Sequence, residues 1–188
     1  MLFYLKKHAA LELLVALTLG GLGYWGIASS GLSVEFELSP RALFLAALGA
    51  AAITAWTLLV QLGYGVARGR EFALDLTASL AKHFASASPT QMLGALAAAA
   101  GEEVLFRGFI HGRWGIWAGA IAFMLAHIGK KDIRTIGYWS IFHGLGFGLI
   151  YELSGNLAVP MLAHGLFDLG AMAFFQWSAD RESHRCAS

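Results

Sequence analysis

Long apolar runs dominate the chain, and short segments that carry charged residues, glycine, proline or serine separate them. An apolar helix of about 20 residues is long enough to cross the roughly 30 Å hydrocarbon core of a bilayer. The pattern therefore predicts an all-α fold, a polytopic transmembrane helical bundle of about six spans. The predicted spans are residues 9–28, 41–66, 90–111, 114–128, 136–151 and 157–177.

The fourth and fifth predicted spans, 114–128 and 136–151, are short for a bilayer. We expect them either to tilt within the bundle or to line a hydrated cavity, because lipid cannot satisfy free backbone groups. Between the second and third spans, residues 71–88 mix apolar with charged side chains. That segment predicts either an amphipathic helix at the cytoplasmic interface or an ordinary connecting helix.

Composition strengthens the membrane interpretation. Of the 188 residues, 57% are hydrophobic and 13% are charged, and the mean hydropathy is +0.62, which together exclude a soluble globular protein. The net charge of +1 implies no nucleic acid and no acidic partner, so the lipid bilayer is the predicted surrounding. The single cysteine, Cys186, allows neither an internal disulfide nor a cysteine-rich zinc site.

The positions of the basic residues predict the orientation in the membrane. Lysine and arginine gather before the first span and after the second, fourth and sixth, whereas the loop at 29–40 carries two glutamates. Positively charged loops tend to remain on the cytoplasmic side. We therefore predict an integral, multi-pass membrane protein with its N- and C-termini in the cytoplasm.

The third predicted span contains three ionisable residues, Glu102, Glu103 and Arg107. A charge at the bilayer centre costs about 3 kcal/mol even on lenient scales, so such residues indicate function by default. Glu103 and Arg107 are four residues apart and share a helix face, whereas Glu102 is rotated by roughly 100° from Glu103. An ion pair between Glu103 and Arg107 would leave Glu102 free to act as a general base. The structural alternative is a buried charge network that only fixes helix packing.

Histidines supply possible partners for Glu102. His127 ends the fourth span, and His164 lies in the sixth span one turn before Asp168, so an imidazole and a carboxylate share one helix face. A lone histidine in an apolar helix is more often a packing residue than a catalyst, and we interpret His143 in that way. His127 and His164, in contrast, each belong to a larger motif.

Three motifs in the predicted spans resemble the signature of a known family. They are Glu102-Glu103-Val-Leu-Phe-Arg107, Phe123-Met-Leu-Ala-His127 and His164-Gly-Leu-Phe-Asp168. In order and spacing they are similar to the motifs of the CAAX prenyl protease type II and bacteriocin-processing group of intramembrane peptidases, the CPBP or ABI family. The resemblance covers about residues 90–170, and the first two spans match only in being hydrophobic. Asp168 stands where many relatives have asparagine.

The resemblance implies an intramembrane endopeptidase built as a single integral membrane domain over residues 1–188. Its expected parts are two N-terminal spans in 1–70, the interfacial segment 71–88 and a four-helix catalytic core in 89–178. The implied partner is a membrane-anchored or hydrophobic protein or peptide substrate, such as a leader, a sorting tail or a lipid-anchored terminus.

The resemblance also implies a mechanism. Glu102 and His127 would hold and deprotonate a water, His164 would be the main donor to the oxyanion, and Asp168 would orient His164 or share a proton with it. No cofactor is required in this mechanism, but a zinc-dependent version with the same four side chains as ligands is the alternative. The expected supporting residues are Glu103, Arg107 and Phe123.

Two further alternatives lie outside peptidase chemistry. A membrane immunity or binding protein of the same family would bind a partner through the same cavity and would tolerate Glu102→Gln. A proton-linked transporter is less favoured because no internal repeat relates the two halves of the chain.

The implied mechanism also requires Glu102 and His127 to lie at a similar depth in the membrane. Residue counting puts Glu102 well up the third span but His127 at the cytoplasmic end of the fourth. A water shared by both side chains requires them to lie within about 8 Å of each other.

Overall fold

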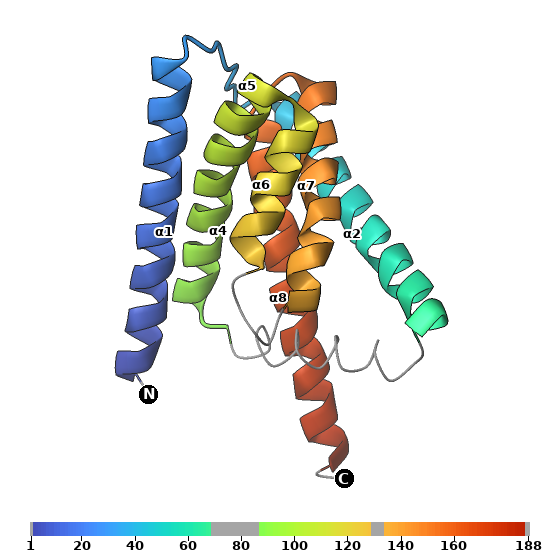
Figure 1. Ribbon diagram of the computed structural model, residues 1–188. Coiled ribbons are helices and arrows are strands. Elements are labelled where there is room, and N and C mark those ends of the chain that lie inside the picture. Colours follow the sequence, from blue (N-terminus) through green and yellow to red (C-terminus); the bar gives the residue numbers. More distant parts are fainter. Residues whose placement is uncertain (1, 69–86, 129–133, 187–188) are drawn as a thin grey trace.

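The computed structural model describes residues 2–68, 87–128 and 134–186, and all regular secondary structure in this part of the chain is helical. Figure 1 shows a bundle in which α4, α6, α7 and α8 lie together, with α1 at one side and α2 at the other. The elements are α1 (Leu2–Ser29), α2 (Pro40–Arg68), α4 (Pro89–Glu103), η1 (Val104–His111), α5 (Gly112–Trp114), α6 (Ile116–His127), α7 (Arg134–Ser154) and α8 (Ala158–Cys186).

The predicted all-α class is confirmed, and each predicted span falls on helix. Among the described residues, three helical stretches are long and apolar enough to cross a membrane, Ala10–Ser29, Pro40–Val60 and Ala158–Ala179. Ile116–His127 is apolar but shorter. The protein is therefore an integral membrane protein. The predicted interfacial segment 71–88 lies outside the described residues except for its last two.

Local sequence explains where α4 begins. Ser88 Oγ accepts the backbone N–H of Gln91 at 3.3 Å, and Gln91 Oε1 accepts the backbone N–H of Ser88 at 2.8 Å. Pro89 occupies the first helical position, where its missing N–H leaves no bond unmade. This cap fixes the start of the helix whose C-terminal end carries Glu102 and Glu103.

The element that follows, η1, is a π-helix that begins directly after Glu103. At its end the N–H of Gly112 bonds to the carbonyl of Arg107, five residues earlier. Wide turns of this kind are rare and occur frequently at functional sites. The backbone therefore departs from regular α-helix between the glutamate pair and His111.

Close backbone contacts hold α1 against α4 and η1. A Cβ at Gly23 would lie 2.6 Å from the backbone nitrogen of Leu105, and a Cβ at Gly101 would collide with the carbonyl of Ala16. Small residues at such contacts let transmembrane helices approach closely. As a result, α1 packs directly behind the segment that carries the two glutamates.

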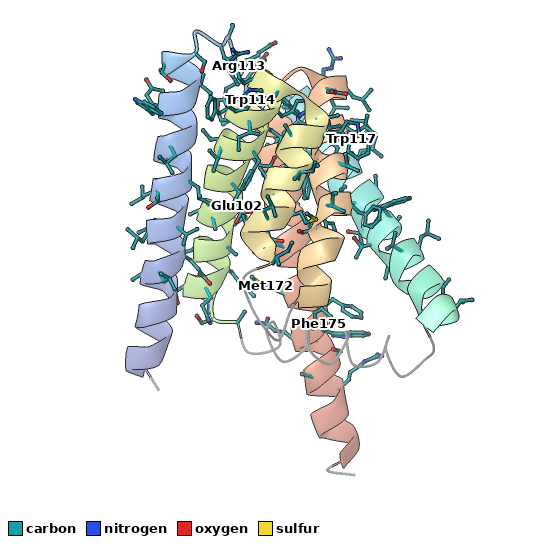
Figure 2. The ribbon with its side chains drawn as sticks, in the orientation of Figure 1. Glu102, Arg113, Trp114, Trp117, Met172 and Phe175 are labelled. Atoms are coloured by element: carbon teal, nitrogen blue, oxygen red, sulfur yellow. The ribbon has the colours of Figure 1, made fainter. Side chains whose placement is uncertain are left out.

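Large aromatic side chains are exposed near both ends of the bundle, as they are at membrane interfaces. α1 begins and α8 ends at the same end of the bundle (Figure 1), and Phe174 and Trp177 are exposed in the C-terminal half of α8. Towards the opposite end Figure 2 shows Trp114 beside Arg113. The exposed aromatic residues there are Tyr24, Trp25, Trp114 and Trp117.

Candidate active site

Glu102 and His127 face each other across two helices. Glu102 Oε2 lies 3.9 Å from His127 Nε2, and both side chains are partly exposed. The other ring nitrogen of His127, Nδ1, lies 2.7 Å from the carbonyl oxygen of Phe123 and donates its proton there. Nε2 of neutral His127 therefore carries a lone pair on the side of Glu102.

The structure removes the mismatch in depth between these two residues. α6 has 12 residues and is about 18 Å long, which is too short to cross a bilayer. Because α6 ends at His127 inside the bundle, the imidazole reaches the level of Glu102, which lies midway along the bundle in Figure 2. Residue counting had placed His127 too close to the cytoplasmic surface, because the sequence does not show the depth at which this short span ends.

Behind Glu102, a fully buried group is built around Glu103. Glu103 Oε1 accepts hydrogen bonds from Arg107 Nη1 and from His164 Nδ1, each at 2.8 Å. The predicted Glu103–Arg107 ion pair is thereby confirmed. Arg107 Nη2 also donates to the carbonyl oxygen of Gly144 on α7 at 3.2 Å. One carboxylate thus links the arginine of η1 to the histidine of α8.

His164 and Asp168 lie on one face of α8, as the sequence predicted. His164 Nε2 is 3.7 Å from Asp168 Oδ2, which is too long for a direct hydrogen bond. We expected Asp168 to orient His164 or to share a proton with it, and the close hydrogen bond to the ring comes from Glu103 on Nδ1. Asp168 therefore contributes a nearby charge, and Glu103 holds the imidazole in place.

Two phenylalanine rings pack between the polar groups. The guanidinium carbon of Arg107 lies 4.6 Å from the ring centre of Phe123, whose ring also packs on the imidazole of His127 at 4.4 Å. Phe147 of α7 stacks on the imidazole of His164, with centroids 4.5 Å apart. The rings exclude water from the Glu103 side of the site and restrict both imidazoles.

Sequence reasoning missed the contribution of α7 and α2. The carbonyl of Gly144 and the ring of Phe147 carry no ionisable group, so their sequence gave no signal of a role. His143, which we interpreted as a packing residue, has its Nε2 2.9 Å from Thr57 Oγ1 of α2. The one available signal was the neighbouring run of glycines at 144–148, which indicated close packing at this part of α7.

Several of these side chains can bind a metal in principle, since Nε2 of His127 and the carboxylates of Glu102 and Asp168 make no short hydrogen bond with another described residue. Over residues 2–68, 87–128 and 134–186, however, no group of three His, Cys, Asp or Glu side chains is arranged to hold an ion. The side chains instead form two pairs: Glu102 with His127, 3.9 Å apart, and His164 with Asp168, 3.7 Å apart.

Comparison with known proteins matches the same part of the chain. Residues 84–170 match the family model of the type II CAAX prenyl endopeptidases, Rce1-like. A 72-residue stretch is 38% identical to the uncharacterized protein YpbD of Bacillus subtilis (strain 168), covering 36% of this chain and 35% of that protein. The matched region thus spans about a third of the length of that curated relative. No solved structure gave a significant match.

Proposed function

We propose that this chain, whose residues 84–170 match the Rce1-like type II CAAX prenyl endopeptidase family, is an intramembrane endopeptidase that cleaves with a water activated by Glu102 and His127. The proposed substrate is a membrane-associated protein or peptide, such as a leader, a sorting tail or a lipid-anchored terminus. The substrate class follows from the position of Glu102 midway along an apolar bundle (Figure 2).

The 3.9 Å gap between Glu102 Oε2 and His127 Nε2 is the observation that carries the proposal. A carboxylate and an imidazole lone pair are both acceptors, so they cannot bond to each other, but one water can donate a proton to each. With both bonds about 2.8 Å long, the angle at the water oxygen is about 90°, close to that of a water molecule. A water held in this way keeps its lone pairs for attack on a carbonyl carbon.

Hydrolysis then needs one proton carrier. The water oxygen bonds to the carbonyl carbon of the scissile peptide, and Glu102 takes the released proton. When the C–N bond breaks, Glu102 returns that proton to the leaving amine nitrogen and is a carboxylate again. Products are a new carboxyl terminus and a new amino terminus. His127 fixes the water and is unchanged at the end of the cycle.

His164 and Asp168 are the proposed partners of the oxyanion. A proton carried by His164 Nε2 or by the carboxyl of Asp168, whose Oδ2 lies 3.7 Å away, can be donated to the negative oxygen as it forms. One such donor contributes on the order of 3 kcal/mol to the transition state. Glu103 engages Nδ1 of His164 at 2.8 Å, which leaves Nε2 as the ring nitrogen available for this bond.

Arg107 and Phe123 act in support. Arg107 neutralises Glu103 inside the bundle, so the two acidic groups left for chemistry are Glu102 and Asp168. Phe123 packs against Arg107 and His127 and provides the carbonyl that holds the imidazole of His127. These residues set the positions of the reacting groups and do not contact the substrate.

We further propose about six membrane crossings, a four-helix catalytic core and cytoplasmic termini. α1 begins and α8 ends at the same end of the bundle (Figure 1), which is compatible with both termini on one side of the membrane. α6 stops at His127, and the carbonyls of a helix that ends inside a membrane need water or protein partners. A hydrated opening below His127 would satisfy them and would admit both the attacking water and the substrate from the cytoplasmic side.

A zinc-dependent version of the same reaction is the alternative mechanism. It would use Glu102, His127, His164 and Asp168 as ligands. No step above relies on a metal, because the described side chains form two pairs and no group of three.

The test compares peptide termini in the membrane proteome of cells that carry wild-type protein with cells that carry Glu102→Gln at equal abundance. We expect specific cleaved termini in the wild type and their loss in the variant, because glutamine cannot take the proton of the water. Glu35→Gln, which alters an exposed carboxylate in the loop between α1 and α2, is the matched control and should keep every terminus. Identical termini in all three strains would favour a membrane immunity or binding protein.

A further inference from the structure

His143 makes contacts that the proposed mechanism does not use. It lies on α7, and its ring packs against Phe167 of α8, the neighbour of Asp168, with centroids 5.2 Å apart. The carbonyl oxygen of the next residue, Gly144, accepts a hydrogen bond from Arg107. His143 therefore belongs to the wall of the candidate site.

Thr57 determines which ring nitrogen of His143 carries the proton. The hydroxyl of Thr57 donates to the carbonyl oxygen of Ile53 at 2.8 Å. A hydroxyl has one proton, so towards His143 the same oxygen acts as an acceptor, at 2.9 Å from Nε2. Nε2 is then protonated, and Nδ1 of the neutral imidazole is left with a lone pair.

The lone pair on Nδ1 is available to a ligand. Among the described residues, the hydrogen bond of the His143 ring is the one to Thr57, and its side chain is partly exposed. A peptide that enters a membrane-embedded site brings backbone N–H groups that have lost water, and each unpaired group costs several kcal/mol. Glu102 and His127 are engaged with the attacking water, so a separate acceptor is needed for the peptide.

Building on the proposed function, we propose that His143 is a substrate-binding residue: its Nδ1 accepts a hydrogen bond from a backbone N–H of the peptide while Thr57 holds the ring in the required tautomer. The site thereby recognises the peptide backbone of its substrate, independently of any lipid attached to it. His143 takes no part in the proton transfers.

Two substitutions of His143 separate this role from a structural one. The side-chain amide of asparagine can place its oxygen near the position of Nδ1, whereas that of glutamine reaches the position of Nε2 and can donate to Thr57. His143→Asn should therefore keep KM within about threefold, while His143→Gln should raise KM about tenfold with little change in kcat, as expected for the loss of one hydrogen bond to substrate.

The assay uses the purified full-length protein and a synthetic peptide that spans the most abundant Glu102-dependent terminus. Thr57→Val should raise KM about threefold, because the ring is then free to turn or change tautomer. Thr54→Val is its control, since Thr54 makes the same kind of bond, to Ala50 at 2.8 Å, on an exposed part of α2. Thr54→Val should leave KM and kcat unchanged.

The outcomes separate the role of His143 from the proposed peptidase function. Equal KM for wild type, His143→Asn and His143→Gln overturns the inference, and so does a defect in His143→Asn alone, which would make the bond to Thr57 purely structural. If His143→Gln does not fold, the comparison of Thr57→Val with Thr54→Val decides, and equal KM values overturn the inference. Absence of any Glu102-dependent terminus overturns the proposed function, and cleavage that ignores His143 overturns only the role of His143.

Discussion

The helices before residue 69 and those after residue 86 contribute in different ways to the same site. The later helices carry every motif residue, and their polar side chains bond to one another across α4, η1 and α8. The earlier helices contact this group mainly through small residues, as at Gly23, where α1 meets the backbone of η1. The family match begins at residue 84 and follows the same division. In the proposed mechanism the second region performs the chemistry, and the first region positions it.

The largest loss of stability is expected when the charge that neutralises Glu103 is removed from the second region. Arg107→Met leaves a fully buried carboxylate without its ion pair, which we expect to destabilise the protein by about 3–5 kcal/mol. Thermal unfolding in detergent measures this loss. Arg113→Met changes an exposed arginine of α5 and is the control. Equal stability of the two variants would contradict a structural role for the buried pair.

The first region is tested by filling the contact between α1 and η1. A Cβ at Gly23 would lie 2.6 Å from the backbone nitrogen of Leu105. A Cβ at Gly21 would have no atom of another described helix within 4 Å. Gly23→Ala should cost about 1–3 kcal/mol of stability and slow cleavage, because backbone must move beside the glutamates. Gly21→Ala should alter neither thermal unfolding nor the rate of cleavage. Matching behaviour of the two alanine variants would mean that α1 does not position the site.

A smaller effect is expected at the position where many relatives carry asparagine. Asp168 lies 3.7 Å from His164 Nε2, so Asp168→Asn removes a charge but no direct hydrogen bond, and the amide can donate to the oxyanion. We expect kcat to remain within about tenfold of wild type, whereas Asp168→Ala should lose about 100-fold. A loss as large in Asp168→Asn as in Asp168→Ala would show that the negative charge is essential.

The smallest expected effect is that of metal removal. Incubation of the purified protein with a chelator, followed by its removal, should leave the rate of peptide cleavage unchanged, because Glu102 and His127 can activate water without an ion. The rate is measured with the same synthetic peptide before and after treatment. Activity that is lost on chelation and restored by zinc would favour the metal-dependent alternative.

Sequence alone predicted the parts of the site that depend on ionisable residues in apolar helices. Glu103 and Arg107 form the ion pair that their spacing predicted, because a charge in a membrane needs a partner. Glu102 and His127, which the family resemblance brought together, are also close in space. The positions of the helices followed from the apolar runs. The ion pair and the helix positions rest on patterns that are local in the chain.

The parts that sequence could not predict depend on contacts between distant helices. That Glu103 bonds to His164 requires the relative rotation of α4 and α8, which no local pattern specifies. The stacking of Phe147 on His164 and the bond from His143 to Thr57 also depend on how distant helices are rotated relative to each other. α6 ends at residue 127, close to the end of the short predicted span 114–128, but its depth was not predicted because the apolar run up to His127 gives no sign of depth.

The central claim is that Glu102 and His127 act on one and the same water, and a double-mutant cycle on peptide cleavage tests it most directly. Glu102→Gln should lower kcat by about 10³-fold, His127→Ala should lower it by about 100-fold, and the double variant should be about as slow as Glu102→Gln alone, since residues that act as a unit are not additive. If the two losses multiply to about 10⁵-fold, the side chains act independently, and a shared water is contradicted.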